Sequence, residues 1–136
     1  MGISSPGVFA QGAPKAAAGK PAVILVVGDS LSAEYGLPRG TGWVALLEKQ
    51  LAQEKINAKV INASVSGETT SGGRSRIAAL LQQHQPSQVV IELGGNDALR
   101  GLPLDMTQAN LTAMARAAKA AGAKVLVVGI AVPPNY

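Results

Sequence analysis

The sequence has no cysteine, few aromatic residues and no long hydrophobic run, and each shortage excludes a class of protein. Without cysteine, the chain has no disulfide, no thiolate nucleophile and no cysteine-ligated metal. Aromatic residues are only 3% and the net charge of +4 is scattered, whereas nucleic-acid-binding surfaces concentrate basic side chains beside aromatic rings. The longest apolar runs, residues 23–27 and 125–130, are far shorter than the ~20 residues of a membrane helix. We therefore expect no nucleic-acid partner and no membrane span.

What remains has the composition of one folded domain behind a tail. Hydrophobic residues make up 47% of the 136 residues and charged residues 15%, as in globular domains. Residues 1–20 are rich in glycine, proline and alanine without periodicity, and residues 8–10 resemble the small-residue end of a secretory signal. We expect residues 1–20 to be a disordered, signal-derived or vector-derived tail and residues 21–136 to be the domain. This tail favours a periplasmic or secreted protein, with a cytoplasmic one left open.

Four short β-branched runs alternate with three helical patterns. Strands are expected at residues 22–27, 58–62, 88–93 and 124–130. Each run is almost continuously apolar, which is typical of parallel strands covered on both faces. The order β-α-β-α-β-α-β predicts a three-layer, flavodoxin-like α/β fold with about four strands. Ligands of such sheets bind outside the carboxyl ends of the strands, where the strand order reverses.

The helical patterns carry their own boundary signals. In the first, Thr41 is expected to cap a helix whose apolar face holds four residues, namely Trp43, Leu46, Leu47 and Leu51. The second is centred on residues 77–81 and ends before Pro86, which disfavours helix at the residue before it. The third begins with Asp105 and Gln108, spaced as a capping box, and ends at Gly122.

Polar loops follow the first three expected strands, so all three lie on the same edge of a parallel sheet. The first loop opens with Gly28, Asp29 and Ser30, the second reads "NASVSGETT" and the third "ELGGNDALRG". A serine on a sharp strand-to-helix turn presents its hydroxyl at the rim of the sheet, as a nucleophile requires. Attack on a carbonyl creates an oxyanion that needs donors fixed in advance. The backbone N–H groups of Ser30 and Gly67 and the side-chain amide of Asn96 are candidates.

Each of these residues also has a structural interpretation. Asp29 and Ser30 occur in ordinary turns and helix caps, and Gly67 suits any turn with a positive φ. Asn96 can bond loop backbone, and we expect Asp29 and Asp97 to support the loops by accepting their N–H groups. Arg100 is expected to be a solvated rim residue.

The three loops together resemble the SGNH (GDSL) hydrolases, in their bacterial thioesterase I/lysophospholipase/arylesterase branch. The matching segments are "GDSLSAEYGL", "NASVSGETTSGG" and "ELGGNDALRGLP", and the resemblance extends from residue 23 to residue 136. It implies that Ser30 is the nucleophile and that Ser30, Gly67 and Asn96 form the oxyanion hole. It also implies that a mobile loop lines the acyl site, comprising Ala98, Leu99, Arg100, Gly101, Leu102 and Pro103. The substrate is then a small acyl or aryl ester or thioester, and no metal or organic cofactor is implied.

The general base is the missing part of this interpretation. Serine needs an adjacent base, usually a histidine oriented by a carboxylate. The only histidine, His84, precedes the third strand and is expected at the amino edge of the sheet, roughly 20 Å from Ser30 at ~3.3 Å per strand residue. The family's Asp-x-x-His block has no counterpart here.

Three explanations follow from the missing block. The chain is a truncated hydrolase, which we favour; or another segment or chain supplies the aspartate and histidine; or the domain binds acyl or aryl ligands without catalysis. A truncated chain would have impaired turnover. Its fourth strand would be an exposed edge, and a homodimer or strand-swapped assembly is then expected.

Overall fold

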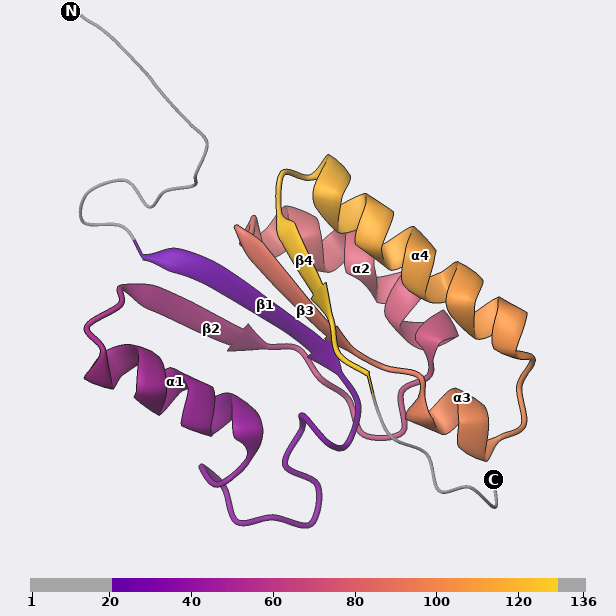
Figure 1. Ribbon diagram of the computed structural model, residues 1–136, viewed down its shortest axis with the longest axis horizontal. Helices are drawn as coiled ribbons and strands as arrows, with labels where there is room; N and C mark the ends of the chain where they lie inside the picture. Colours follow the sequence, from indigo (N-terminus) through magenta and orange to yellow (C-terminus); the bar gives the residue numbers. More distant parts are fainter. Residues whose placement is uncertain (1–20, 130–136) are drawn as a thin grey trace, which may run out of the picture.

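The computed structural model describes residues 21–129, in which four parallel strands form one sheet of order β2-β1-β3-β4 (Figure 1). The strands are β1 (Ala22–Gly28), β2 (Ala58–Asn62), β3 (Gln88–Glu92) and β4 (Lys124–Val127). The chain first moves from β1 to β2 on one side and then returns to place β3 on the other. The strand order therefore reverses between β1 and β3, at the centre of the sheet. The fourth strand ends at Val127, earlier than predicted. The predictions for residues 1–20 and for residue 130 lie outside the described residues.

Helices cover both faces of the sheet, which confirms the predicted three-layer α/β architecture. The helices are α1 (Trp43–Gln53), α2 (Thr70–His84), α3 (Gly95–Leu99) and α4 (Leu104–Ala120). α1 lies on one face beside β2, while α2 and α4 pack against each other on the opposite face (Figure 1). α3 was expected to be loop, because five residues that begin with glycine carry no helical periodicity.

The core lies between β1, β3 and the α2–α4 pair. Leu25 and Val27 of β1 are fully buried there, in a cluster that also contains Val89, Ile91, Ile77, Leu81, Met114 and Ala118. Complete burial of one such side chain contributes roughly 1.5–3 kcal/mol. The prediction that every strand is covered on both faces holds for β1 and is wrong for the edges. β2, an edge strand, has no fully buried residue. Leu126 of β4, at the other edge, is 60% exposed, because α1 packs beside β2 and does not cover β4.

Several predicted helix boundaries need correction. Gly42, not Thr41, is the N-cap of α1, and the Thr41 hydroxyl donates to the Pro38 carbonyl instead. The expected capping box at Asp105 does not form, because the N-cap of α4 is Pro103, two residues earlier, and it makes no side-chain cap bond. The apolar face of α1 is also weaker than predicted: Leu46 is 54% exposed, and Val44 is the fully buried residue. The predicted end of α4 is confirmed, since Gly122 follows its C-cap with φ of +89°.

Among residues 21–129, no helix has both the length and the hydropathy that crossing a bilayer requires.

Candidate active site

The three polar loops meet at the carboxyl edge of the sheet, beside the point where the strand order reverses. The Val65 N–H of the second loop donates to the Gly28 carbonyl at 3.0 Å. The Asn96 amide of the third donates to the Glu68 carbonyl at 3.0 Å and lies 3.5 Å from Asp29 Oδ2. The structure thus brings the segments of Ser30, Gly67 and Asn96 together, as expected from the sequence, and their catalytic roles stay predictions.

The turn that carries Ser30 depends on the two residues before it, Gly28 and Asp29. The Asp29 carbonyl accepts the Ser32 and Ala33 N–H groups at 3.0 and 2.9 Å, and its Oδ1 accepts the Leu31 N–H at 3.0 Å. Gly28 is required by close packing, since a Cβ there would stand 2.6 Å from the Ser32 hydroxyl and 2.8 Å from Glu92 Oε1. Ser30 itself is half-buried at the rim. Asp29 therefore has the supporting place expected for it.

Gly67 is needed for its backbone conformation. Its φ is +82°, and an added Cβ would meet no atom within 4 Å, so space is not the constraint. Its carbonyl accepts from the Arg100 guanidinium at 3.4 Å. The turn interpretation of Gly67 is thus satisfied by the structure, and it is compatible with an N–H group that faces a substrate.

Asn96 lies in α3, which begins after Gly94 in a positive-φ conformation of +123°. One of its two amide hydrogens is engaged by the Glu68 carbonyl, which fixes the side chain across the second loop. An asparagine amide has two donors, and the second faces Asp29 Oδ2 at the longer distance of 3.5 Å. The backbone-bonding interpretation is therefore satisfied, and the oxyanion interpretation requires a substrate oxygen to replace Asp29 at the second N–H.

Asp97 joins three helices through one buried carboxylate. It accepts the Thr70 N–H at 2.8 Å, the Thr70 hydroxyl at 2.5 Å and the Thr107 hydroxyl at 2.8 Å. Burial alone would raise the pKa of Asp97, but these hydrogen bonds outweigh it and lower the pKa below its usual value. Asp97 thus attaches the segment of Asn96 to the N-terminus of α2 and to α4.

The segment 98–103 forms an exposed rim beside these loops. Ala98 and Leu99 complete α3 and are exposed, as are Arg100, Gly101 and Pro103, while Leu102 is half-buried. The Leu102 N–H donates to the Asp97 carbonyl at 3.0 Å, so the segment is attached at that point. The Arg100 guanidinium joins it to the Gly67 carbonyl, and the substrate-lining role of the segment stays a prediction.

Sequence reasoning missed a buried polar group beneath the Ser30 turn. Glu92 is the last residue of β3 and is 3% exposed; its Oε1 accepts the Ser32 hydroxyl at 2.6 Å and the Asp29 N–H at 3.3 Å. Burial raises the pKa of Glu92 to about 7; the Ser32 hydrogen bond opposes this increase, and the charge of Asp29 adds to it. The signal available in the sequence was an acid at the end of an otherwise apolar strand.

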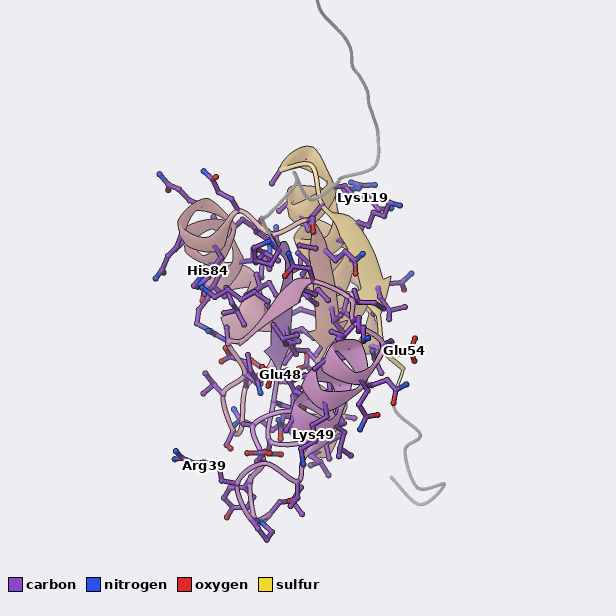
Figure 2. All side chains as sticks on the ribbon, turned by 90° about the vertical axis from the view of Figure 1, so that its left-hand side faces the viewer. Arg39, Glu48, Lys49, Glu54, His84 and Lys119 are labelled. Atoms are coloured by element: carbon purple, nitrogen blue, oxygen red, sulfur yellow. The ribbon has the colours of Figure 1, made fainter. Side chains whose placement is uncertain are left out.

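His84 lies at the opposite edge of the sheet, as predicted. It is the last residue of α2, and the strand that follows pairs Gln88 with Ile24 near the start of β1. Figure 2 shows His84 well away from Arg39, which lies in the loop after Ser30. Within residues 21–129, no group of three potential ligands gathers into a metal site.

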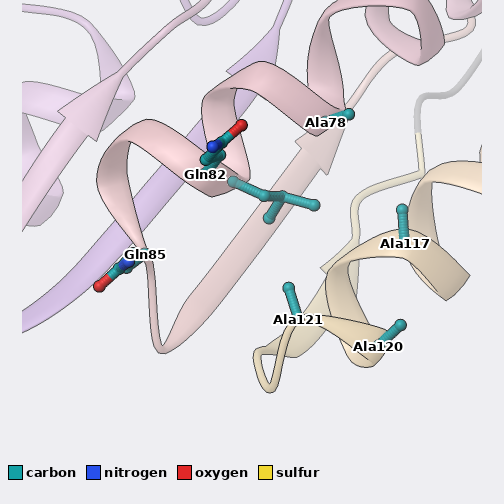
Figure 3. Close-up of a pocket in the computed structure, with 7 residues that line it drawn as sticks. Ala78, Gln82, Gln85, Ala117, Ala120 and Ala121 are labelled. Atoms are coloured by element: carbon teal, nitrogen blue, oxygen red, sulfur yellow. The ribbon is translucent and has the colours of Figure 1, made fainter.

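An open groove of about 600 Å³ lies at the His84 end of the molecule rather than beside Ser30. It runs between the C-terminal parts of α2 and α4 (Figure 3). Alanine side chains and two glutamines line most of it, and it includes none of the predicted site residues. We assign it no part in the site.

Comparison with known proteins supports this arrangement. The sequence profile of the GDSL-like lipase/acylhydrolase family matches residues 26–136. The esterase TesA of Pseudomonas aeruginosa is 57% identical over 113 residues, and the arylesterase of Vibrio mimicus is 47% identical; the alignments cover 83% of this chain and 56% of each relative. A psychrotrophic esterase EstA from Pseudoalteromonas sp., solved with monoethylphosphonate as inhibitor, superposes with a TM-score of 0.79 at 48% identity, covering 84% of this chain and 62% of that one.

The chain thus spans about half the length of the curated relatives it matches. The family match covers all three polar loops and the sheet that carries them, so the resemblance inferred from the sequence is confirmed. The chain belongs to the GDSL-like lipase/acylhydrolase family.

Proposed function

We propose that this domain hydrolyses carboxylic esters or thioesters through an acyl-serine intermediate at Ser30. The Ser30 oxygen attacks the carbonyl carbon, and its proton passes to a base that another segment or chain must supply, because His84 lies at the opposite edge of the sheet. That base returns the proton to the departing alcohol or thiol, and water then releases the acid and regenerates Ser30; without the base, turnover is impaired. The observation that carries this proposal is the position of Ser30 at the end of β1, where the loops of Gly67 and Asn96 converge on it. The names of the relatives, esterase and arylesterase, support the same reaction class.

The oxyanion of this reaction would be held by the Ser30 and Gly67 N–H groups and the Asn96 amide. Asn96 donates to the Glu68 carbonyl at 3.0 Å and to Asp29 Oδ2 at 3.5 Å, and these bonds orient the amide before substrate arrives. Loss of a single donor of this kind costs roughly 10²–10³ in rate in a well-studied protease. An Asn96→Ala substitution therefore belongs in any test of the proposal.

The substrate would be a small acyl or aryl ester or thioester placed against residues 98–103. Leu99 in this segment is exposed, as is Leu31 next to Ser30 in the sequence, so two of the loops at this edge carry exposed apolar side chains. Exposed apolar side chains at a site rim favour an uncharged acyl or aryl group over a polar one. Arylesterase, acyl-CoA thioesterase and lysophospholipase activities all fit this description.

Labelling with a fluorophosphonate tests the nucleophile directly. Covalent labelling of the wild-type chain that is abolished in Ser30→Ala, slowed in Asn96→Ala and unchanged in Ser66→Ala, an exposed serine of the second loop, would show an activated nucleophile. No labelling of the wild-type chain would show an inactive fragment without its base. Because His84 lies at the far edge, His84→Gln should label at the wild-type rate. Equal labelling of Ser30→Ala and wild type, read by intact mass, would refute the assignment.

A second candidate is a non-catalytic module that binds acyl or aryl ligands at the same edge. It is favoured by one observation: the only histidine of the sequence lies at the opposite edge from Ser30. This alternative predicts binding of a fatty-acyl ligand that persists in Ser30→Ala, with no release of product by wild type. Titration calorimetry and product analysis on the same samples separate the two functions.

We also propose that two copies associate through β4 and that the protein acts in the periplasm or outside the cell. β4 has no strand beyond it within residues 21–129, and Leu126 and Val127 are exposed, so a second copy could add to this edge. Light scattering that shows only monomer at high concentration would contradict the dimer. Fractionation of the native host would test the compartment, which is suggested by the character of residues 1–20.

A further inference from the structure

A chain of hydrogen bonds runs beneath the Ser30 turn and ends on a carboxylate that the proposed reaction does not use. The Trp43 indole donates to the Ser32 hydroxyl at 2.9 Å, which donates to Glu92 Oε1 at 2.6 Å. The same oxygen accepts the N–H of Asp29, the residue before Ser30, at 3.3 Å. One carboxylate oxygen of β3 thus holds the turn after β1 at two points.

This carboxylate is unusual for a supporting group. Asp29, Ser32 and Glu92 are each at most 3% exposed, and Glu92 Oε2 is buried without a hydrogen-bond partner in the described structure. A buried carboxylate with one unsatisfied oxygen costs stability in its charged form. Asp29, in the turn after β1, is the charged group beside Glu92, whereas the Ser32 hydroxyl that donates to Glu92 and the Trp43 indole that donates to Ser32 are neutral. Burial and the charge of Asp29 together raise the pKa of Glu92 to about 7.

We propose that Glu92 is a positioning residue for Ser30, acting through the Asp29 N–H and the Ser32 hydroxyl, and that its negative charge tightens the turn. The catalytic consequence rests on the proposed function, but the effect on the turn does not. Hydrogen bonds to an ionised acceptor are roughly twice as strong as those between neutral groups. Protonation of Glu92 therefore weakens both bonds.

Trp43 offers a direct readout, because it is the only tryptophan and its indole joins the same chain of bonds. We expect the Trp43 emission and the amide NMR shifts of Asp29 and Ser30 to change together with a midpoint near pH 7 in the full chain. Glu92→Gln keeps the shape and the acceptor oxygen but removes the charge, so these changes should disappear. Glu34→Gln is the matched control, since Glu34 Oε2 accepts the Gly40 and Gly42 N–H groups and touches neither Ser32 nor Asp29.

A control variant without histidine and a measurement of the labelling rate complete the test. In His84→Gln, which has no imidazole, the pH-dependent change in the amide NMR shifts of Asp29 and Ser30 should persist. In the wild type, the rate of Ser30 labelling by fluorophosphonate should rise as the pH increases through the same midpoint. In Glu92→Gln, the labelling rate should be lower and should show no rise at this midpoint. If Glu92→Gln fails to fold, Ser32→Ala serves instead, with the emission change lost and the Asp29 shift retained.

The two proposals fail in different ways. The positioning role of Glu92 is overturned if the amide NMR shifts of Asp29 and Ser30 still change with pH in Glu92→Gln. It is also overturned if these shifts do not change with pH in the wild type. A wild-type chain that shows the titration but takes no label at Ser30 overturns the nucleophile assignment and leaves the effect of Glu92 on the turn supported. Equal labelling rates and pH profiles in wild type and Glu92→Gln also overturn the positioning role.

Discussion

Substitution of Asp97 by alanine should destabilise the domain by about 3–5 kcal/mol. Asp97 accepts three hydrogen bonds, two from Thr70 and one from Thr107, and both threonines are buried. Its removal leaves these three donors without their acceptor, and each buried, unsatisfied group costs about 1–3 kcal/mol. The sum is reduced because the two threonine hydroxyls can rotate toward other acceptors and the site relaxes. The loss would separate α3 from α2 and α4.

The assay is urea unfolding at pH 7, followed by far-ultraviolet circular dichroism. Asp105→Ala is the matched control, because Asp105 is an exposed aspartate whose side chain makes no cap bond, and it should change stability by less than ~0.5 kcal/mol. The lowered pKa of Asp97 adds a second signature: its stabilisation is complete above pH ~4 and lost as the pH falls below the folded-state pKa. A stability within 1 kcal/mol of wild type for Asp97→Ala would refute the reasoning.

Two further predictions concern the buried group beneath the Ser30 turn. Gly28→Ala should cost about 1–3 kcal/mol in urea unfolding, because its Cβ would stand 2.6 Å from the Ser32 hydroxyl, whereas Gly129→Ala has open space and should be neutral. Since the pKa of Glu92 is raised to about 7, the folded protein keeps a proton that the unfolded chain releases, so stability should fall as pH rises from 4.5 to about 7. Glu92→Gln should lack this slope; an unchanged slope would contradict the assignment.

The sequence predicts the sheet well because its central strands are strongly apolar. β1 and β3 are covered by helices, and their continuous hydrophobic runs identify them; the loops that follow them hold Ser30 and Asn96. The burial of the edge strands is not predictable in this way. Lys124–Val127 has the same apolar pattern as a central strand, and only the tertiary arrangement leaves Leu126 exposed.

The candidate site shows the same division. Ser30, Gly67 and Asn96 are identified by local motifs, because each motif follows a recognisable strand. Glu92 and Ser32 are not, since their pairing joins residues that are 60 apart in the sequence. The capping box at Asp105 was wrong for a related reason: Pro103 fixes the backbone at the start of α4, and this takes precedence over a side-chain cap.

The strand order also determines when the Ser30 turn acquires its support during synthesis. Asp29 and Glu92 are separated by 63 residues, so a ribosome adding about 5–20 residues per second needs several seconds to make the second after the first. β3 must then pair with β1 on the side away from β2 before the Glu92 carboxylate reaches the turn. The nascent chain therefore carries the serine early in an unfixed loop, and its final presentation is a late event of folding.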